Sequence, residues 1–394
     1  MRLKKSLKNL IYSFGYYIVT ILGSFVLRKI MLFTIGLSGV SLNSLFNEII
    51  AMLSLSELGV GTAIVYNLYK PLSEKDEKKI QQLMWLFKKA YWIITGVVLI
   101  LGVVLLPFIT QIVNGVGFSK GYIRYIYLLF VIQTALSYLF AYKRTLLAAD
   151  QKNYVSATID SVFKIVIIVC GCIVLLFTKR FDIYLYTLIV LQFTNNIWIS
   201  QKVDSLYPYI KNNKEKLPNE EIKQVLSNVM NLFVGKVSGT VTNSTDNILI
   251  SVLVNTLECG LYANYALIIN AVKQILVQMT NAIQGSVGNL YAEGDNEHIV
   301  EVYKRMTYMY FILALIFCTG YMCGATSFIS WIFGKKYVMV NAVLFVTTIN
   351  MFFHILRDPL WQMITVSGLF SEDKYIALIG TLVNLIVSVL IGIK

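Results

Sequence analysis

The chain has 394 residues, of which 57% are hydrophobic and only 14% are charged, and its formal net charge is +13. Apolar stretches of about 20 residues, the length of a helix that crosses a bilayer, recur almost from end to end. This composition excludes a water-soluble chain of several domains, and it predicts an all-α polytopic membrane protein.

Eleven membrane-spanning helices are predicted from the hydropathy pattern. They cover approximately residues 9–35, 44–69, 84–111, 122–148, 154–178, 183–201, 224–253, 259–291, 303–326, 339–366 and 375–393. The first apolar run follows MRLKKSLK and lacks a small-residue cleavage site, so it is predicted to remain as the first span.

The lysines and arginines of the predicted loops are distributed unequally between the two sides of the membrane. Most of them share the side of the N-terminus, and the other side carries only Lys120, Arg124, Lys179, Arg180, Lys335 and Lys336. Because positive loops resist translocation, the N-terminus is predicted to be cytoplasmic, in a bacterial inner membrane. The excess positive charge then reflects topology and attraction to anionic membrane lipids, without a nucleic-acid partner.

Metal and redox chemistry have little support in the sequence. The five cysteines form no C-x-x-C motif, and the two histidines do not stand at ligand spacing. The cysteines are interpreted as packing residues, and no cofactor and no metal site are predicted.

The chain also repeats itself at an offset of about 220 residues. NLYKPLSEKDEKKIQQL from Asn67 is echoed by NLYAEGDNEHIVEVYKR from Asn289, and LLAADQKNYV from Leu146 is echoed by SGLFSEDKYI from Ser367. Two parallel repeats are therefore predicted: a six-helix lobe in residues 1–203, a cytoplasmic linker in 204–223 and a second lobe in 224–394. The second lobe has five spans where six are expected, so it is predicted to be incomplete.

Arg28 and Lys29 stand side by side in the apolar run GSFVLRKIMLFTIG. On a helix Arg28 lies about 12 Å from Gly36, inside the apolar slab, where a charge needs water or a counter-charge. Helical spacing places Arg28 at the end of a polar stripe, whereas Lys29 falls about 100° away. The other members of the stripe are Ser24, Thr20, Tyr17, Ser13 and Asn9.

Comparable polar stripes occur on other predicted spans, and several such faces in one bundle indicate a shared wet space. Their charged and polar members include Glu48 and Tyr66; Arg144; Asp160 and Lys164; Asn231, Lys236, Asn243 and Asp246; and His354, Arg357 and Trp361. A structural interpretation stays open for some of them, with Asp160 and Lys164 as an internal pair at i,i+4 and Arg144 as an interfacial anchor.

Several segments resemble one family of membrane proteins. LSLSELGVGTAIVYNLYKPLSEKD, TLLAADQKNYV, NSTDNILIS and GLYANYALI are similar to the polysaccharide transporter branch of the multidrug/oligosaccharidyl-lipid/polysaccharide exporter superfamily. The family includes flippases for O-antigen and capsule repeat units. The resemblance implies two pseudo-symmetric helical lobes that rock around a central cavity. It also implies translocation of an undecaprenyl-diphosphate-linked oligosaccharide, with a glycan polymerase and assembly proteins as partners.

The chemistry of such a substrate suggests roles for the residues of the polar stripes. A diphosphate needs fixed positive groups, for which Arg28, Lys236 and Arg357 are predicted. The sugars need hydroxyl, amide and aromatic partners, which are predicted to be Tyr17, Tyr66, Asn231, Asn243 and Trp361. If Na+ or H+ drives transport, the candidate coupling carboxylates are Asp246, Glu48 and Asp160.

Two other functions remain as alternatives. A multidrug or cation antiporter of the same superfamily would use an anionic cavity, but the deep basic residues match or outnumber Glu48, Asp160, Asp246 and Asp358. A membrane glycan polymerase or transferase would need a sizeable catalytic loop outside the membrane, and the predicted outer loops are short. The sequence therefore favours a transporter without catalytic residues.

Overall fold

A computed structural model describes residues 2–367 with gaps at 55–59, 151, 212–216, 219–220, 223–247 and 294, and a few residues beyond 378. The residues that it describes are almost entirely helical, and none of them forms a strand. The predicted seventh and eleventh spans lie mostly outside the described residues. The all-α class predicted from the sequence is confirmed.

The contacts divide the chain into two compact units, Met1–Leu257 together with Thr381–Lys394, and Glu258–Gly380. The helices of the first unit are α1 (Arg2–Thr34), α2 (Gly36–Leu53), α3 (Val60–Glu74), α4 (Glu77–Ile112), α5 (Lys120–Tyr138), α6 (Ala141–Ala149), α7 (Asn153–Thr178), α8 (Phe181–Leu206) and η2 (Pro208–Lys211). Those that follow are α10 (Thr256–Glu293), α11 (Asn296–Ile332), η3 (Lys335–Tyr337) and α12 (Asn341–Ser367). The predicted lobe boundaries at residues 203 and 224 stay a prediction.

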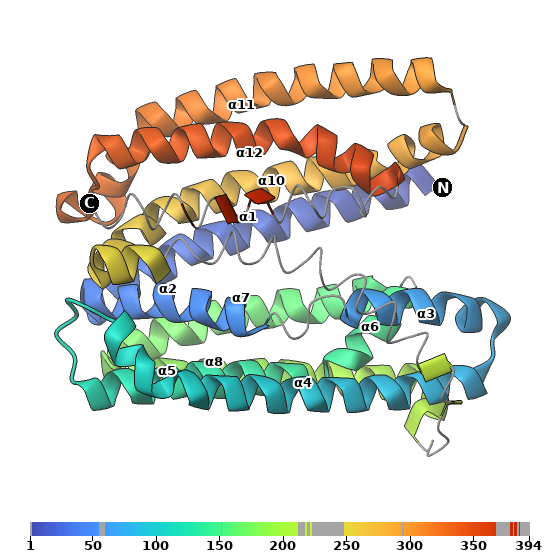
Figure 1. Ribbon diagram of the computed structural model, residues 1–394, viewed down its shortest axis with the longest axis horizontal. Helices are drawn as coiled ribbons and strands as arrows, with labels where there is room; N and C mark the ends of the chain where they lie inside the picture. Colours follow the sequence, from blue (N-terminus) through green and yellow to red (C-terminus); the bar gives the residue numbers. More distant parts are fainter. Residues whose placement is uncertain are drawn as a thin grey trace. The chain divides into compact units, whose positions relative to one another are not determined.

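The consecutive long helices α4 and α5, α7 and α8, and α11 and α12 pack as antiparallel pairs (Figure 1), whereas α1 and α7 run parallel, with Gly23 near Ile168 and Leu27 near Gly171. In the first unit α4 packs against α5, and α7 packs against both α1 and α8. In the second unit α11 and α12 run side by side. This is the packing expected of long apolar helices joined by short connections.

The second and fourth predicted spans differ from the sequence prediction. The second span is not one helix, because α2 ends at Leu53 and α3 begins at Val60. The chain turns into α2 directly after α1, at Gly36, whose φ of 68° suits a residue without a side chain. The fourth span consists of α5 and α6, which are bent by 42° at the break between them.

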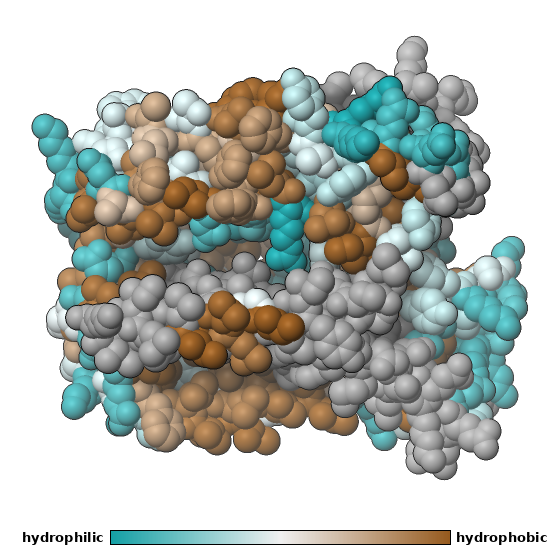
Figure 2. All heavy atoms as spheres, turned by 45° about the horizontal axis from the view of Figure 1, so that its top comes forward, coloured by the Kyte–Doolittle hydropathy of each residue, from teal (hydrophilic) through white to brown (hydrophobic). Residues whose placement is uncertain are grey.

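Three described helices are long and apolar enough to cross a membrane, namely Glu77–Ile112, Tyr154–Thr178 and Glu297–Ile332. The bent α5–α6 pair would add a fourth. The other predicted spans with described helices are not confirmed by this criterion. Hydrophobic side chains cover broad stretches of the described surface (Figure 2). The chain is therefore a multi-pass membrane protein.

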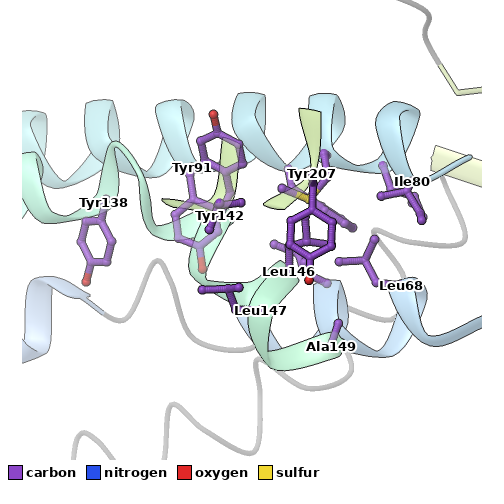
Figure 3. Packing of buried hydrophobic residues seen from close by; sticks show 14 of the residues in the cluster. Leu68, Ile80, Tyr91, Tyr138, Tyr142, Leu146, Leu147, Ala149 and Tyr207 are labelled. Carbon is purple, nitrogen blue, oxygen red and sulfur yellow. The ribbon is translucent and has the colours of Figure 1, made fainter. Parts of the chain in front are cut away.

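A buried hydrophobic cluster joins α3, α4, α6 and α8 at one end of the first unit (Figure 3). The short helix α6 contributes Tyr142, Leu146 and Ala149, which follow one another at helical spacing and therefore share one face. They pack with Leu68 of α3 and with Tyr207 at the end of α8. Because this face of α6 is buried in the cluster, the orientation of α6 about its axis is fixed. The directions in which its other side chains point are fixed as a result.

Charged residues surround the same cluster. Lys143 is buried and donates hydrogen bonds to Ser200 Oγ at 2.7 Å and to Asp204 Oδ1 at 2.6 Å. Asp150 accepts a hydrogen bond from Tyr207 and pairs with Lys152 at 2.7 Å. Burial opposes ionisation of Asp150, but the bonds from Lys152 and Tyr207 outweigh it and lower the pKa of this carboxyl. These pairs tie α6 to α8 on the predicted cytoplasmic side.

The close approach of α4 and α5 at Gly102 gives a test of the packing. A methyl group at Gly102 would lie 2.5 Å from Val131 Cγ1, whereas no atom lies within 4 Å of one at Gly96. Gly102→Ala is expected to destabilise the protein by about 1–3 kcal/mol because the helices must move apart. Gly96→Ala should leave it unchanged or stabilise it by up to about 1 kcal/mol. Thermal unfolding of both variants in detergent measures the difference, and equal midpoints would contradict this packing.

Candidate functional site

A polar cavity of about 450 Å³ lies within the first unit, between α5, α6, α7 and α8. Polar groups at this depth of a membrane protein are costly unless they pair or carry out a function. The polar residues that line the cavity are Arg144, Asp160, Lys164, Gln192, Asn195 and Asn196. We identify this cavity as the candidate functional site.

Arg144 connects three of the helices around the cavity. Its Nη1 donates to Asp160 Oδ2 of α7 at 2.7 Å, and its Nη2 donates to Asn196 Oδ1 of α8 at 2.9 Å. Arg144 lies on α6, whose axis is bent by 42° relative to that of α5. Two directional bonds from different nitrogens of one side chain suit the planar guanidinium.

Asp160 is engaged through both of its carboxylate oxygens. Oδ2 accepts from Arg144, and Oδ1 accepts from Asn195 Nδ2 at 2.8 Å. The side chains of Arg144 and Asp160 are 30% and 37% exposed, so both remain accessible from the cavity. At this exposure the ion pair adds little to stability, and a ligand can reach either partner.

Lys164 lines the cavity one turn after Asp160, but among the described residues it forms no ion pair. The structure therefore corrects the interpretation of Asp160 and Lys164 as an internal pair, since Arg144 occupies the carboxylate instead. The interpretation of Arg144 as an interfacial anchor stays a prediction. The described lining has two cations and one carboxylate, which leaves an excess positive charge.

Neutral polar groups complete the surroundings of the cavity. Gln133 Nε2 donates to Gln192 Oε1 at 2.8 Å. Among the described residues, no donor reaches the buried Oε1 of Gln133 or the buried Oδ1 of Asn195. Buried acceptors without a donor are costly, and the one on Asn195 belongs to a residue that lines the cavity.

Sequence analysis did not single out the contribution of α8 to this site. Gln192, Asn195 and Asn196 stand in the stretch LQFTNNIW at spacings of three and four residues. This spacing places them on one face of a helix, and it is the signal that would have identified them.

Arg28 lies elsewhere in the first unit, on α1. It is half-buried, its Nη1 donates to Ser44 Oγ of α2 at 3.5 Å, and it interacts electrostatically with Tyr184 of α8. No carboxylate of the described residues forms an ion pair with it, while the neighbouring Lys29 is exposed. Arg28 is thus a half-buried cation whose described partners are neutral.

Arg357 and Trp361 come together on α12 of the second unit. The guanidinium carbon of Arg357 lies 5.7 Å from the centroid of the Trp361 ring, which is the geometry of a cation–π contact. Lys273 of α10 interacts electrostatically with His354 and Asp358 of the same face. This exposed group combines positive charge with an aromatic surface.

The other predicted site residues are distributed as follows. Glu48 is half-buried on α2 and Tyr66 is 67% exposed on α3, so the broken second span places them on separate helices. The side chain of Tyr17 lies outside the described part of α1. The remaining predicted residues, also outside the described residues, are Asn231, Lys236, Asn243 and Asp246.

The structure thus describes an all-α membrane protein of two compact units, with a polar cavity in the first. No family model and no curated protein matches the chain. Solved structures do match its fold: an inward-facing multidrug resistance MATE family transporter of the MOP superfamily is similar with a TM-score of 0.59 and 13% identity, over 94% of this chain and 83% of that one. The Vibrio cholerae MATE transporter VcmN, in a mutant form, is similar with a TM-score of 0.58 and 13% identity, over 93% of this chain and 85% of its own.

A third similar structure is the MATE multidrug transporter DinF-BH in complex with a ligand, with a TM-score of 0.52 and 15% identity over 92% of this chain and 84% of that one. These similarities confirm the predicted all-α fold with two lobes. At such low identity they concern the fold, and the choice of substrate depends on the chemistry of the site.

Proposed function

We propose that this protein is a flippase that translocates an undecaprenyl-diphosphate-linked oligosaccharide across the bacterial inner membrane by alternating access. The observation that carries the proposal is the charge of the polar cavity, where Arg144 and Lys164 outnumber Asp160. Arg28 adds a second half-buried cation without a carboxylate partner among the described residues. Fixed positive charge at membrane depth suits an anionic substrate and disfavours a cationic one.

The composition of the cavity also suits an oligosaccharide. A diphosphate accepts paired hydrogen bonds from a guanidinium, and the guanidinium of Arg144, here bonded to Asp160 and Asn196, is the group of the cavity that would donate them. Sugar hydroxyls need both donors and acceptors, which the amides of Gln192, Asn195 and Asn196 provide. In the second unit, Arg357 beside Trp361 offers a cation together with an aromatic ring.

Coupling to Na+ or H+ would act through Asp160 in this proposal. A cation bound at Asp160 neutralises the carboxylate, so Arg144 becomes available to the phosphate of the substrate. Departure of the cation restores the ion pair and releases the phosphate. Glu48 and Asp246 remain the other candidate coupling carboxylates.

A multidrug antiporter is the second candidate, because the similar solved structures are MATE transporters, two of them described as multidrug transporters. An exporter of cationic drugs would need a net negative binding surface, which the described lining does not provide. A glycan polymerase or transferase is the weakest candidate.

Deletion of the gene in its bacterium tests the proposal. A flippase defect should cause undecaprenyl-diphosphate-linked repeat units to accumulate on the cytoplasmic leaflet, measured by extraction and mass spectrometry of the lipid-linked pool. Complementation with the intact gene should remove the accumulation. Unchanged lipid-linked pools together with new sensitivity to cationic drugs would support the antiporter and overturn the flippase.

A further inference from the structure

Two tryptophans and two lysines form a basic aromatic patch on α4, which we define as Trp85, Lys88, Lys89 and Trp92. With Ile93 they line a groove of about 610 Å³. Lys89 Nζ lies 4.1 Å from the centroid of the Trp85 ring, and Lys88 Nζ lies 5.9 Å from that of Trp92. The spacing of three, four and seven residues places all four side chains on one face of the helix.

Beside this face, turned by about 110° around the helix axis, α4 continues as an exposed apolar stripe. Its members after Trp92 are Ile93, Val97, Ile100, Val104 and Phe108, which recur every three or four residues and are all exposed. The opposite face packs into the core through Phe87, Tyr91, Ile94 and Val98. Since α4 is one of the helices able to cross a membrane, the exposed stripe is the side that meets lipid.

The length of the stripe sets the depth of the basic aromatic patch. From Trp92 to Phe108 the helix rises about 24 Å, and from Lys88 to Phe108 about 30 Å, which is the thickness of the hydrocarbon core. Lys88 and Lys89 therefore lie at the level of the headgroups when the stripe is in the hydrocarbon. Tryptophan prefers this same level, because its ring is apolar and its N–H is polar.

We propose that the basic aromatic patch of α4 is a binding site for the headgroup of an anionic phospholipid. The described lining contains two lysines and no carboxylate, so it complements a phosphodiester. The rings of Trp85 and Trp92 hold the lysine chains beside the groove, and the adjoining stripe accommodates the acyl chains. The site does not depend on which substrate the protein transports.

Native mass spectrometry of the full chain in detergent tests this site, with phosphatidylglycerol and phosphatidylcholine as the two probes. The wild-type protein should bind phosphatidylglycerol in preference to phosphatidylcholine. Each juxtamembrane lysine contributes about fivefold to such binding, so Lys88→Ala with Lys89→Ala should weaken phosphatidylglycerol binding about thirtyfold. Phosphatidylcholine binding should be unchanged.

Two further variants make the outcome decisive. Lys70→Ala with Lys202→Ala removes two exposed lysines from the same predicted side and should retain the preference. An equal loss in this control would show diffuse attraction and overturn the site. Lys88→Arg with Lys89→Arg changes both side chains but keeps both positive charges, so it should preserve binding. This result would show that the alanine variant loses binding because it loses charge. Displacement of the lipid by inorganic phosphate at equal concentration would also overturn the proposal.

Discussion

Arg144→Ala is expected to lower substrate affinity by about tenfold to a hundredfold, because it removes a hydrogen-bonded charge at a partly buried site. Arg144→Lys should also be harmful although it keeps the charge. The guanidinium contacts Asp160 and Asn196 with different nitrogens, and a single ammonium cannot reproduce both bonds in the same geometry. Binding of lipid-linked oligosaccharide to purified variants, each at normal membrane levels, measures the effect.

A double variant tests the alternative explanation, in which Arg144 affects binding indirectly by neutralising the charge of Asp160. Arg144→Ala leaves Asp160 without its counter-ion, whereas Arg144→Ala with Asp160→Asn removes both charges at once. If Arg144 holds the substrate, the double variant should reach a higher membrane level than Arg144→Ala but should bind the substrate no better. Recovery of full transport by the double variant would show that Arg144 is only a structural counter-ion.

Asp160→Asn by itself distinguishes coupling from substrate binding. The change removes the negative charge at residue 160, so Arg144 loses its ionic partner. The amide oxygen of the asparagine can still accept the hydrogen bond from Arg144. Anionic substrate should therefore bind at least as well as in the wild type, and the transport rate should lose its dependence on a Na+ or H+ gradient. Proteoliposomes with and without the gradient measure this. A variant that stays fully gradient-dependent would remove Asp160 from the coupling mechanism.

Arg28→Ala is expected to have the second large effect, a severe loss of transport. An arginine at this depth costs at least about 2.5 kcal/mol and is tolerated only beside water or a counter-charge. The described partners of Arg28 are the hydroxyl of Ser44 and the phenol group of Tyr184, so its charge is available to a phosphate. Arg28→Lys should be harmful as well, because a lysine offers a point charge in place of two parallel bonds.

Lys29→Ala is the matched control for Arg28, since Lys29 is adjacent but exposed. It should transport nearly as well as the wild type at equal membrane level. Ser44→Ala tests whether the hydrogen bond of Arg28 to Ser44 is the important contact, and it should have a small effect. If Lys29→Ala is the more damaging change, or if Arg28→Lys is silent, Arg28 does not hold the phosphate.

Composition and hydropathy alone determined that the chain is an all-helical membrane protein. Long apolar stretches have no stable alternative to helices in lipid, because every backbone polar group must be satisfied within the segment. The same patterns identified the polar positions Arg144, Asp160 and Lys164. The stretch SLSELGVG between α2 and α3 contains the polar residues and glycines that mark a break, but it was predicted as part of one span. The bend between α5 and α6 lies within an apolar stretch that carries no such signal.

Only the tertiary structure decided which of these polar groups meet. Arg144 and Asp160 are 16 residues apart, and Arg144 and Asn196 are 52 residues apart, on three different helices. Helical periodicity specifies the face that a residue occupies on its own helix, but not the neighbour that this face packs against. The pairing of Asp160 with Arg144 rather than Lys164 arises because the packing of α6 against α7 brings the guanidinium to the carboxylate.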